Sequence, residues 1–164
     1  MSKKKFFVDE TVFDNIDNQD NAYFLGLLYA DGCNYDNTGV IKIDLIERDV
    51  KTLESFKDFL KYNGTIKYYK SETKIIGGVS CICQPSCRLS FRSKIISENL
   101  TKYGCTSNKT YTLMFPSEDI VPNNLIRHFI RGYMDGDGGI SYWVDNENTG
   151  HKKFQINFCG TTDI

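Results

Sequence analysis

The chain has 164 residues, of which 40% are hydrophobic and 25% charged, and its net charge is −1 at neutral pH. This length suits one domain with a substantial core, or one and a half small units, and the composition is that of a globular protein rather than a disordered chain. No apolar run approaches the roughly 20 residues that span a bilayer, and the lysine-rich start lacks the apolar stretch of a signal peptide, so we expect a cytoplasmic protein with no membrane partner.

Hydrophobic periodicity predicts helices and strands in alternating groups. A first helix is expected from about Asp20 to Ala30, with Asp17 or Asn18 as its cap. Later strands are predicted where apolar and polar residues alternate, and later helices where apolar residues recur every three or four positions. In chain order these are a strand over VIKIDLIER, a helix over DVKTLESFKDFLKY from Asp49, strands over GTIKYYK and SCRLSFRS, a helix over KIISENLTKYG ending at Gly104, a helix from Pro122 to Met134, and strands over GGISYWVD and KKFQINFCG.

This order of elements predicts an α+β fold in which helices cover one face of antiparallel sheets. Charge is distributed unevenly: residues 64–109 hold eight lysine and arginine residues against two acidic ones, whereas both ends of the chain are acidic. Such asymmetry favours a basic surface for a polyanion. We expect the uncovered sheet face to contact double-stranded DNA through Lys42, Arg48, Lys67, Tyr69, Arg88, Ser90 and Arg92.

The six cysteines are expected to be reduced thiols. Three of them, Cys81, Cys83 and Cys87, lie in the segment CICQPSC, whose spacing differs from the paired Cys-x-x-Cys of common zinc sites. We interpret these three as small strand residues, with structural zinc as the lesser alternative.

An internal repeat is the most informative feature of the sequence. The stretches FLGLLYADG and IRGYMDGDG share a glycine, a small residue four positions later, and then an aspartate and a glycine, at an offset of 106 residues. Small residues at that spacing let two helices approach closely. We therefore expect the two helices to pack against each other through Gly26, Ala30, Gly132 and Gly136.

If the helices pack in this way, Asp31 and Asp137 emerge side by side at the ends of the interface. Two close carboxylates repel unless a positive charge lies between them, and hard oxygen ligands suit Mg²⁺, with Mn²⁺ as a second candidate. Because metal ions beside a phosphodiester can activate water and stabilise the leaving oxygen, the pair indicates metal-dependent phosphodiester chemistry on nucleic acid.

The doubled motif resembles the signature helices of the LAGLIDADG homing endonucleases, in their single-chain form with two motifs. LTKYGCTSNKT also resembles the family's segment before the second motif, and it places Lys109 as the lysine near the active site. The resemblance implies a fold of αββαββα repeats with a saddle of antiparallel sheets. It further implies that Asp31 and Asp137 bind the metals, that the sheets lie in the DNA major groove, and that both strands are cut across the minor groove.

The resemblance divides the chain into an N-terminal extension (1–19), a first repeat (20–110) and the start of a second repeat (111–164). By symmetry with the first repeat, the second is expected to need about 70 to 80 further residues. This expectation and the pI of 6.1 favour an alternative function, a non-catalytic protein on the same fold that regulates DNA, assists splicing or inhibits another protein. Self-association or a protein partner is the corresponding expectation, whereas the two intact aspartates favour the endonuclease.

Overall fold

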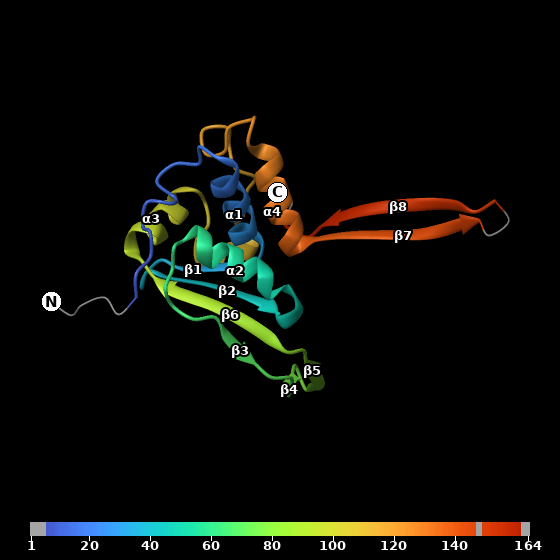
Figure 1. Ribbon diagram of the computed structural model, residues 1–164. Helices are drawn as coiled ribbons and strands as arrows, with labels where there is room; N and C mark the ends of the chain where they lie inside the picture. The colour runs from blue at the N-terminus through green and yellow to red at the C-terminus, as the bar shows by residue number, and fades with distance from the viewer. Residues whose placement is uncertain (1–5, 147–148, 162–164) are drawn as a thin grey trace.

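The computed structural model describes residues 6–146 and 149–161, and they form an α+β fold (Figure 1). Its helices are α1 (Gln19–Ala30), α2 (Val50–Phe59), α3 (Lys94–Lys102) and α4 (Ile126–Asp137), with short 3₁₀ turns η1 (Glu47–Asp49) and η2 (Lys109–Tyr111). Its strands are β1 (Gly32–Tyr35), β2 (Val40–Ile46), β3 (Lys67–Tyr69), β4 (Glu72–Ile76), β5 (Val79–Cys83), β6 (Ser86–Arg92), β7 (Gly138–Asn146) and β8 (His151–Phe158). None of these helices combines the length and the apolar character that crossing a membrane requires.

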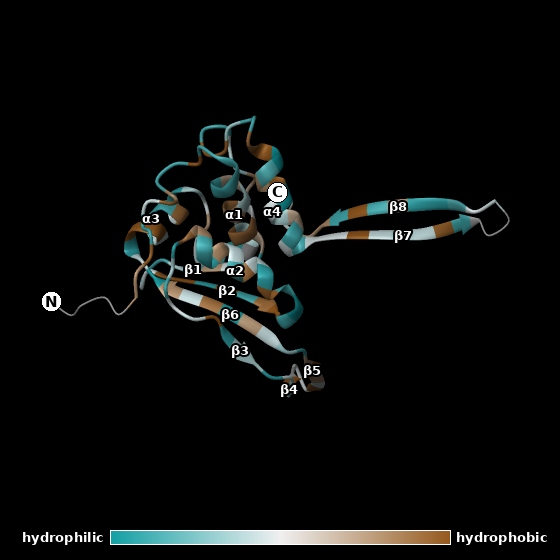
Figure 2. Cartoon of the chain, in the orientation of Figure 1, coloured by the Kyte–Doolittle hydropathy of each residue, from teal (hydrophilic) through white to brown (hydrophobic). Residues whose placement is uncertain are grey.

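The main sheet has four strands in the order β1-β2-β6-β3, and all of its neighbouring pairs are antiparallel. Helices α1, α2 and α3 lie on one side of it (Figure 1). Two hairpins lie outside this sheet. One is β4–β5; the other is β7–β8, which follows α4 and projects away from the helices, with hydrophobic residues along both of its strands (Figure 2).

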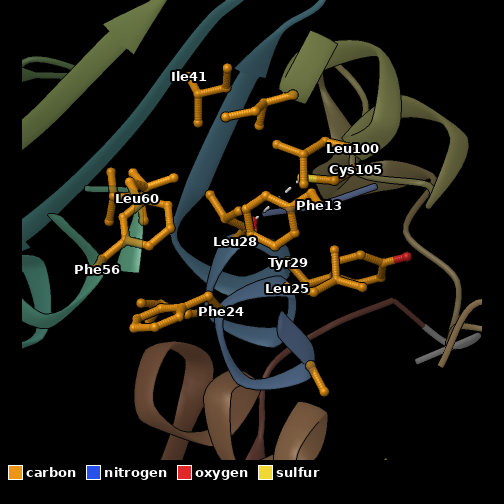
Figure 3. Packing of buried hydrophobic residues seen from close by; sticks show 14 of the residues in the cluster. Phe13, Phe24, Leu25, Leu28, Tyr29, Ile41, Phe56, Leu60, Leu100 and Cys105 are labelled. Carbon is orange, nitrogen blue, oxygen red and sulfur yellow. Dashed lines mark hydrogen bonds between the residues drawn. The ribbon is translucent and has the colours of Figure 1, made fainter. Parts of the chain in front are cut away.

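The core lies between the main sheet and its helices (Figure 3). Alternate residues of β2, Ile41 and Ile43, are 0% exposed, which is what the apolar–polar alternation predicted. They share this core with Leu53 and Phe56 of α2 and Leu100 of α3. Burial of each such side chain stabilises the fold by about 1.5–3 kcal/mol.

The segment of residues 6–18 contributes three side chains to the same core. Val8, Phe13 and Ile16 are buried, and Asp9 forms an ion pair with Lys61 at 2.7 Å. This segment, expected as an extension, therefore contributes directly to the first unit, while residues 1–5 lie outside the described part of the chain.

The predicted first helix is confirmed, and its cap is Asn18, whose side chain accepts hydrogen bonds from the backbone N–H groups of Asp20 and Asn21. The prediction for the last helix is wrong at both ends, since α4 spans Ile126–Asp137 instead of starting at Pro122 and ending at Met134. The Pro122 carbonyl instead accepts a hydrogen bond from the N–H of Leu125, so residues 122–125 form a turn before the helix. Proline is compatible with either role, which is why its position alone misplaced the start.

The β4–β5 hairpin was not expected as a separate element. Its two central residues, Gly77 and Gly78, have φ values of 58° and 84°. A two-residue turn with positive φ at both positions matches the twist of the flanking strands, and glycine adopts it without steric cost. Cys81 and Cys83 lie in β5 and Cys87 lies in β6, so all three are strand residues, as interpreted.

Candidate active site

Helices α1 and α4 pack at unusually close range through two glycines. A Cβ atom added to Gly26 would lie 2.1 Å from the Phe129 carbonyl oxygen, and one added to Gly132 would lie 1.9 Å from the Tyr23 carbonyl oxygen. Residues 129 and 132 follow residues 23 and 26 by the repeat offset of 106, so the two contacts are the same contact made in both directions. This reciprocity is the mark of a two-fold relation, here between two copies of one motif within a single chain.

The side chains around the glycines repeat this two-fold relation. The ring of Tyr29 packs edge-on against the ring of Phe129, with centroids 5.0 Å apart. At the two-fold-related place, the Tyr23 hydroxyl donates to the Asp135 carboxylate at 2.7 Å. One copy of the motif thus carries an aromatic contact where the other carries a polar one.

At the C-terminal end of the helix pair, Gly136 lies against Ala30 and Asp31. A Cβ atom at Gly136 would lie 2.3 Å from the Ala30 Cβ and 2.9 Å from Oδ2 of Asp31. Asp31 caps α1 and Asp137 is the last residue of α4, so both carboxylates lie at the same end of the interface. All four small residues expected at the helix interface are therefore brought together.

Burial and mutual repulsion make this end of the interface unfavourable for negative charge. Burial, followed by the charge of Asp137, raises the pKa of Asp31 to about 6, and the ammonium of Lys109 opposes the rise. Burial also raises the pKa of Asp137, again opposed by Lys109. Two carboxylates held this close both carry charge only where a positive charge lies near them.

Lys109 contacts the end of α1 directly. Its Nζ donates hydrogen bonds to the carbonyl oxygens of Tyr29 and Ala30, the latter at 2.7 Å. The last carbonyls of a helix lack partners within the helix and carry partial negative charge, so an ammonium is favourable there. Lys109 therefore adds positive charge at the end of the helix where Asp31 lies.

The loop that carries Lys109 is held by Asn34, a residue that sequence reasoning missed. Asn34 is 2% exposed, and its Nδ2 donates to the carbonyl oxygens of Ser97 at 3.0 Å and Cys105 at 2.9 Å. The backbone carbonyl of Asn34 accepts a hydrogen bond from the Ser107 hydroxyl at 3.1 Å. Asn34 is a polar residue at an inward-facing position of a strand, and this pattern could have identified it. A buried side-chain amide requires hydrogen-bond partners.

A polar cleft of about 620 Å³ lies beside Asp31 and is also lined by Asp44, Asp49 and Asp135. Arg48 lines this cleft and forms an ion pair with Asp49 at 3.8 Å. The expectation that Arg48 belongs to the strand that carries Lys42 is wrong. Strand β2 ends at Ile46, and residues 47–49 turn into η1 before α2 begins, which takes Arg48 out of the strand alternation.

The other six residues of the expected DNA surface do share one face. In the sheet register Lys42 lies opposite Ser90 and Lys67 opposite Arg88. Residues directly opposite each other, and residues two apart on one strand, point to the same side. The face away from the helices thus carries Lys42, Lys67, Tyr69, Arg88, Ser90 and Arg92, and we call it the outer sheet face.

Asp44 also lies on the outer sheet face, directly opposite Arg88, and was not included in the expected surface. It forms ion pairs with Lys42 at 3.0 Å and with Arg88, whose guanidinium also lies over the Tyr69 ring at 4.8 Å. These two cations hold the pKa of Asp44 below its ordinary value against the effect of burial. The net positive charge of the face is therefore smaller than its lysines and arginines suggest.

The donor set at Asp31 and Asp137 fits a hard divalent cation, because Mg²⁺ is commonly held by one or two carboxylates together with water and phosphate oxygens. The missing Cβ of Gly136 leaves the space that Oδ2 of Asp31 occupies. Within residues 6–146 and 149–161, no group of three or more His, Cys, Asp or Glu side chains is placed to bind a metal.

Replacing Asp31 with asparagine should make the fold more stable at neutral pH. The folded state holds the Asp31 proton up to about pH 6, whereas the ordinary pKa is 3.8, so the wild-type protein loses stability as the pH rises from about 4 to 6. After allowance for solvent screening, we expect Asp31→Asn to gain about 1 kcal/mol above pH 6 relative to wild type, and almost nothing near pH 4. Urea denaturation of both proteins at pH 4.5 and 7.5 measures this difference; a constant difference across this range would contradict it.

A scan of the chain against protein-family models found no match, and a search of curated proteins found none either.

Proposed function

We propose that this chain is a site-specific double-strand DNA endonuclease built on the LAGLIDADG homing endonuclease fold, with Asp31 and Asp137 as ligands of Mg²⁺ or Mn²⁺. The observation that carries the proposal is the two-fold contact between the motif copies, which brings two carboxylates to one end of the Gly26–Gly132 helix pair. A duplex has two strands of opposite polarity, so a two-fold pair of acidic groups matches the symmetry of a double-strand cut.

The residues of this chain have separate tasks in such a reaction. The outer sheet face orients the duplex through phosphate and base contacts from its cations, Tyr69 and Ser90. Asp31 and Asp137 hold the cation, which when bound supplies positive charge beside the phosphate and makes a water molecule more acidic. Lys109, anchored on the α1 carbonyls, keeps a fixed positive charge near the reacting phosphate.

The direct test is selection from a library of random duplexes in Mg²⁺. The expected result is an enriched target whose two strands are cut in Mg²⁺ or Mn²⁺ and left intact in EDTA. Enrichment without cutting would favour the alternative, a DNA-binding regulator on the same scaffold. No enrichment at low ionic strength would overturn both.

Substitutions on the outer sheet face should change DNA affinity in opposite directions. Asp44→Asn removes the negative charge that pairs with Lys42 and Arg88, so we expect tighter DNA binding. Arg92→Ala should weaken binding and, if Arg92 contacts a phosphate, lower the log–log salt slope by about 0.9. Fluorescence anisotropy over a salt series measures both effects.

The matched control for this surface is Glu54→Gln on α2. It removes one negative charge, as Asp44→Asn does, but at an exposed position on the helical side of the molecule. It should leave affinity close to wild type. If Asp44→Asn and Glu54→Gln had equal effects, only the overall charge of the protein would matter, and the outer sheet face would not be the DNA surface.

A further inference from the structure

Two thiols lie side by side on one face of the β4–β5 hairpin. Cys81 and Cys83 are two residues apart on β5, so both side chains point to the same side of the strand. The register places Lys74 opposite Cys81 and Glu72 opposite Cys83, whereas Ile82, between the two cysteines, points to the other side. Both cysteines are free and partly exposed, so an ion in solution can reach the pair.

The third cysteine of the segment CICQPSC does not belong to this pair. Cys87 lies on β6 and is 0% exposed, and its Sγ lies 3.6 Å from the carbonyl oxygens of Leu45 and Ile46. In the part of the chain that the structure describes, no three His, Cys, Asp or Glu side chains are grouped as metal ligands. Structural zinc takes four ligands, so the alternative of zinc at these three cysteines lacks its donor set.

The spacing of the two thiols distinguishes the remaining kinds of link between them. Residues two apart on a strand are about 6.6 Å apart, and their Cβ atoms point the same way. A disulfide needs Cβ atoms about 3.5–4.5 Å apart, so a bond between Cys81 and Cys83 would distort the strand. Two metal–sulfur bonds in line separate the sulfurs by about 4.6 Å, which two thiols on one face reach by leaning toward each other.

We propose that Cys81 and Cys83 form a two-coordinate binding site for Cu(I). Thiolates are the soft ligands that favour Cu(I), and a pair of them in line needs no third ligand. Each thiol gives up its proton on binding, so the ion and the two thiolates together carry one negative charge. The site is separate from Asp31 and Asp137 and does not depend on the proposed function.

Lys74 supplies the opposite charge that this complex needs. Its ammonium donates a hydrogen bond to the Glu72 carboxylate at 2.7 Å, which holds it beside the cysteine pair. This hydrogen bond and the charge of Glu72, followed by the charge of Cys83, raise the pKa of Lys74. Because Lys74 is exposed, we expect Lys74→Gln to weaken Cu(I) binding by only about twofold to fivefold.

Competition with the chelator bicinchoninate, without oxygen and with ascorbate as reductant, measures Cu(I) binding to the full chain. We expect one tightly bound ion per chain. Cys81→Ser and Cys83→Ser should each weaken its binding at least about a hundredfold, because a second thiol on the same face acts at a high effective concentration. Cys33→Ser and Cys159→Ser each remove one exposed thiol elsewhere and should leave the affinity unchanged.

Amide spectra of the ¹⁵N-labelled full chain locate the ion. Cu(I) should shift the signals of β4 and β5 and leave those of α1 and α4 in place. Zn²⁺ at the same concentration should leave the hairpin signals unchanged, because two thiols provide only half of its usual four ligands. The dispersion of each variant's spectrum verifies that it is folded.

Three outcomes would overturn the proposal. They are a Cu(I) affinity of Cys81→Ser or Cys83→Ser equal to that of wild type, shift changes centred on Cys33 or Cys159, and equal binding of Zn²⁺ at the hairpin. The last would assign the thiols to a zinc site instead.

Discussion

Gly132→Leu is expected to lower the free energy of unfolding by at least about 3 kcal/mol. A Cβ atom at this position would lie 1.9 Å from the backbone oxygen of Tyr23 and 2.9 Å from the backbone nitrogen of Leu27. Backbone atoms cannot rotate away as a flexible side chain can, so the two helices must separate. Separation would expose Phe129 and Tyr133, which are 1% and 5% exposed in the intact protein. Because small domains are stable by only about 5–15 kcal/mol, this loss is a large fraction of the total.

Urea denaturation followed by far-UV circular dichroism measures the effect. Gly139→Leu is the matched control, since a Cβ atom there would meet no other atom within 4 Å, and it should change stability by less than about 0.5 kcal/mol. If Gly132→Leu unfolded at the wild-type urea concentration, the close contact between α1 and α4 would be refuted.

Asp31→Asn and Asp137→Asn are each expected to reduce Mg²⁺-dependent DNA cleavage by at least about a hundredfold while leaving DNA affinity within about twofold of wild type. An amide keeps the size of the side chain but removes the charge that a divalent cation needs. Neither residue lies on the outer sheet face, so the contacts that position the duplex remain. The two effects together distinguish a lost metal ligand from a lost DNA contact.

Asp135→Asn is the control for this pair of variants. Asp135 also lines the polar cleft, but it accepts a hydrogen bond from the Tyr23 hydroxyl, which an amide oxygen can accept as well. It should therefore cut at close to the wild-type rate. Titration of Mn²⁺ in the presence of DNA gives a readout that does not depend on cleavage. We expect Asp31→Asn and Asp137→Asn to bind Mn²⁺ more weakly than wild type, and Asp135→Asn to bind it equally well. Cleavage by either of them at the wild-type rate would remove the carboxylate pair from the mechanism.

Local patterns were enough to predict most of the secondary structure. Alternation along β2 and β6 and helical spacing in α2 and α3 depend on residues close in sequence, and those elements formed where the patterns placed them. The wrong predictions concern places where the local sequence is compatible with two different backbone structures. Pro122 suits a helix start as well as a turn, and Arg48 continues an alternation that η1 interrupts.

The amino-acid sequence shows that two motif copies exist, that each places a glycine on a helix face, and that each ends in an Asp-Gly pair. These are properties of spacing along one chain. The folded structure adds that the two copies contact each other reciprocally, that Lys109 caps α1, and that Asn34 holds the loop beneath it. It also shows that Asp44 neutralises part of the outer sheet face, and that Ile156 and Phe158 remain exposed whereas Ile41 and Ile43 are buried. Burial, ion pairing and close packing depend on residues that are far apart in sequence. The periodicity of a segment carries no information about which distant residues will contact it.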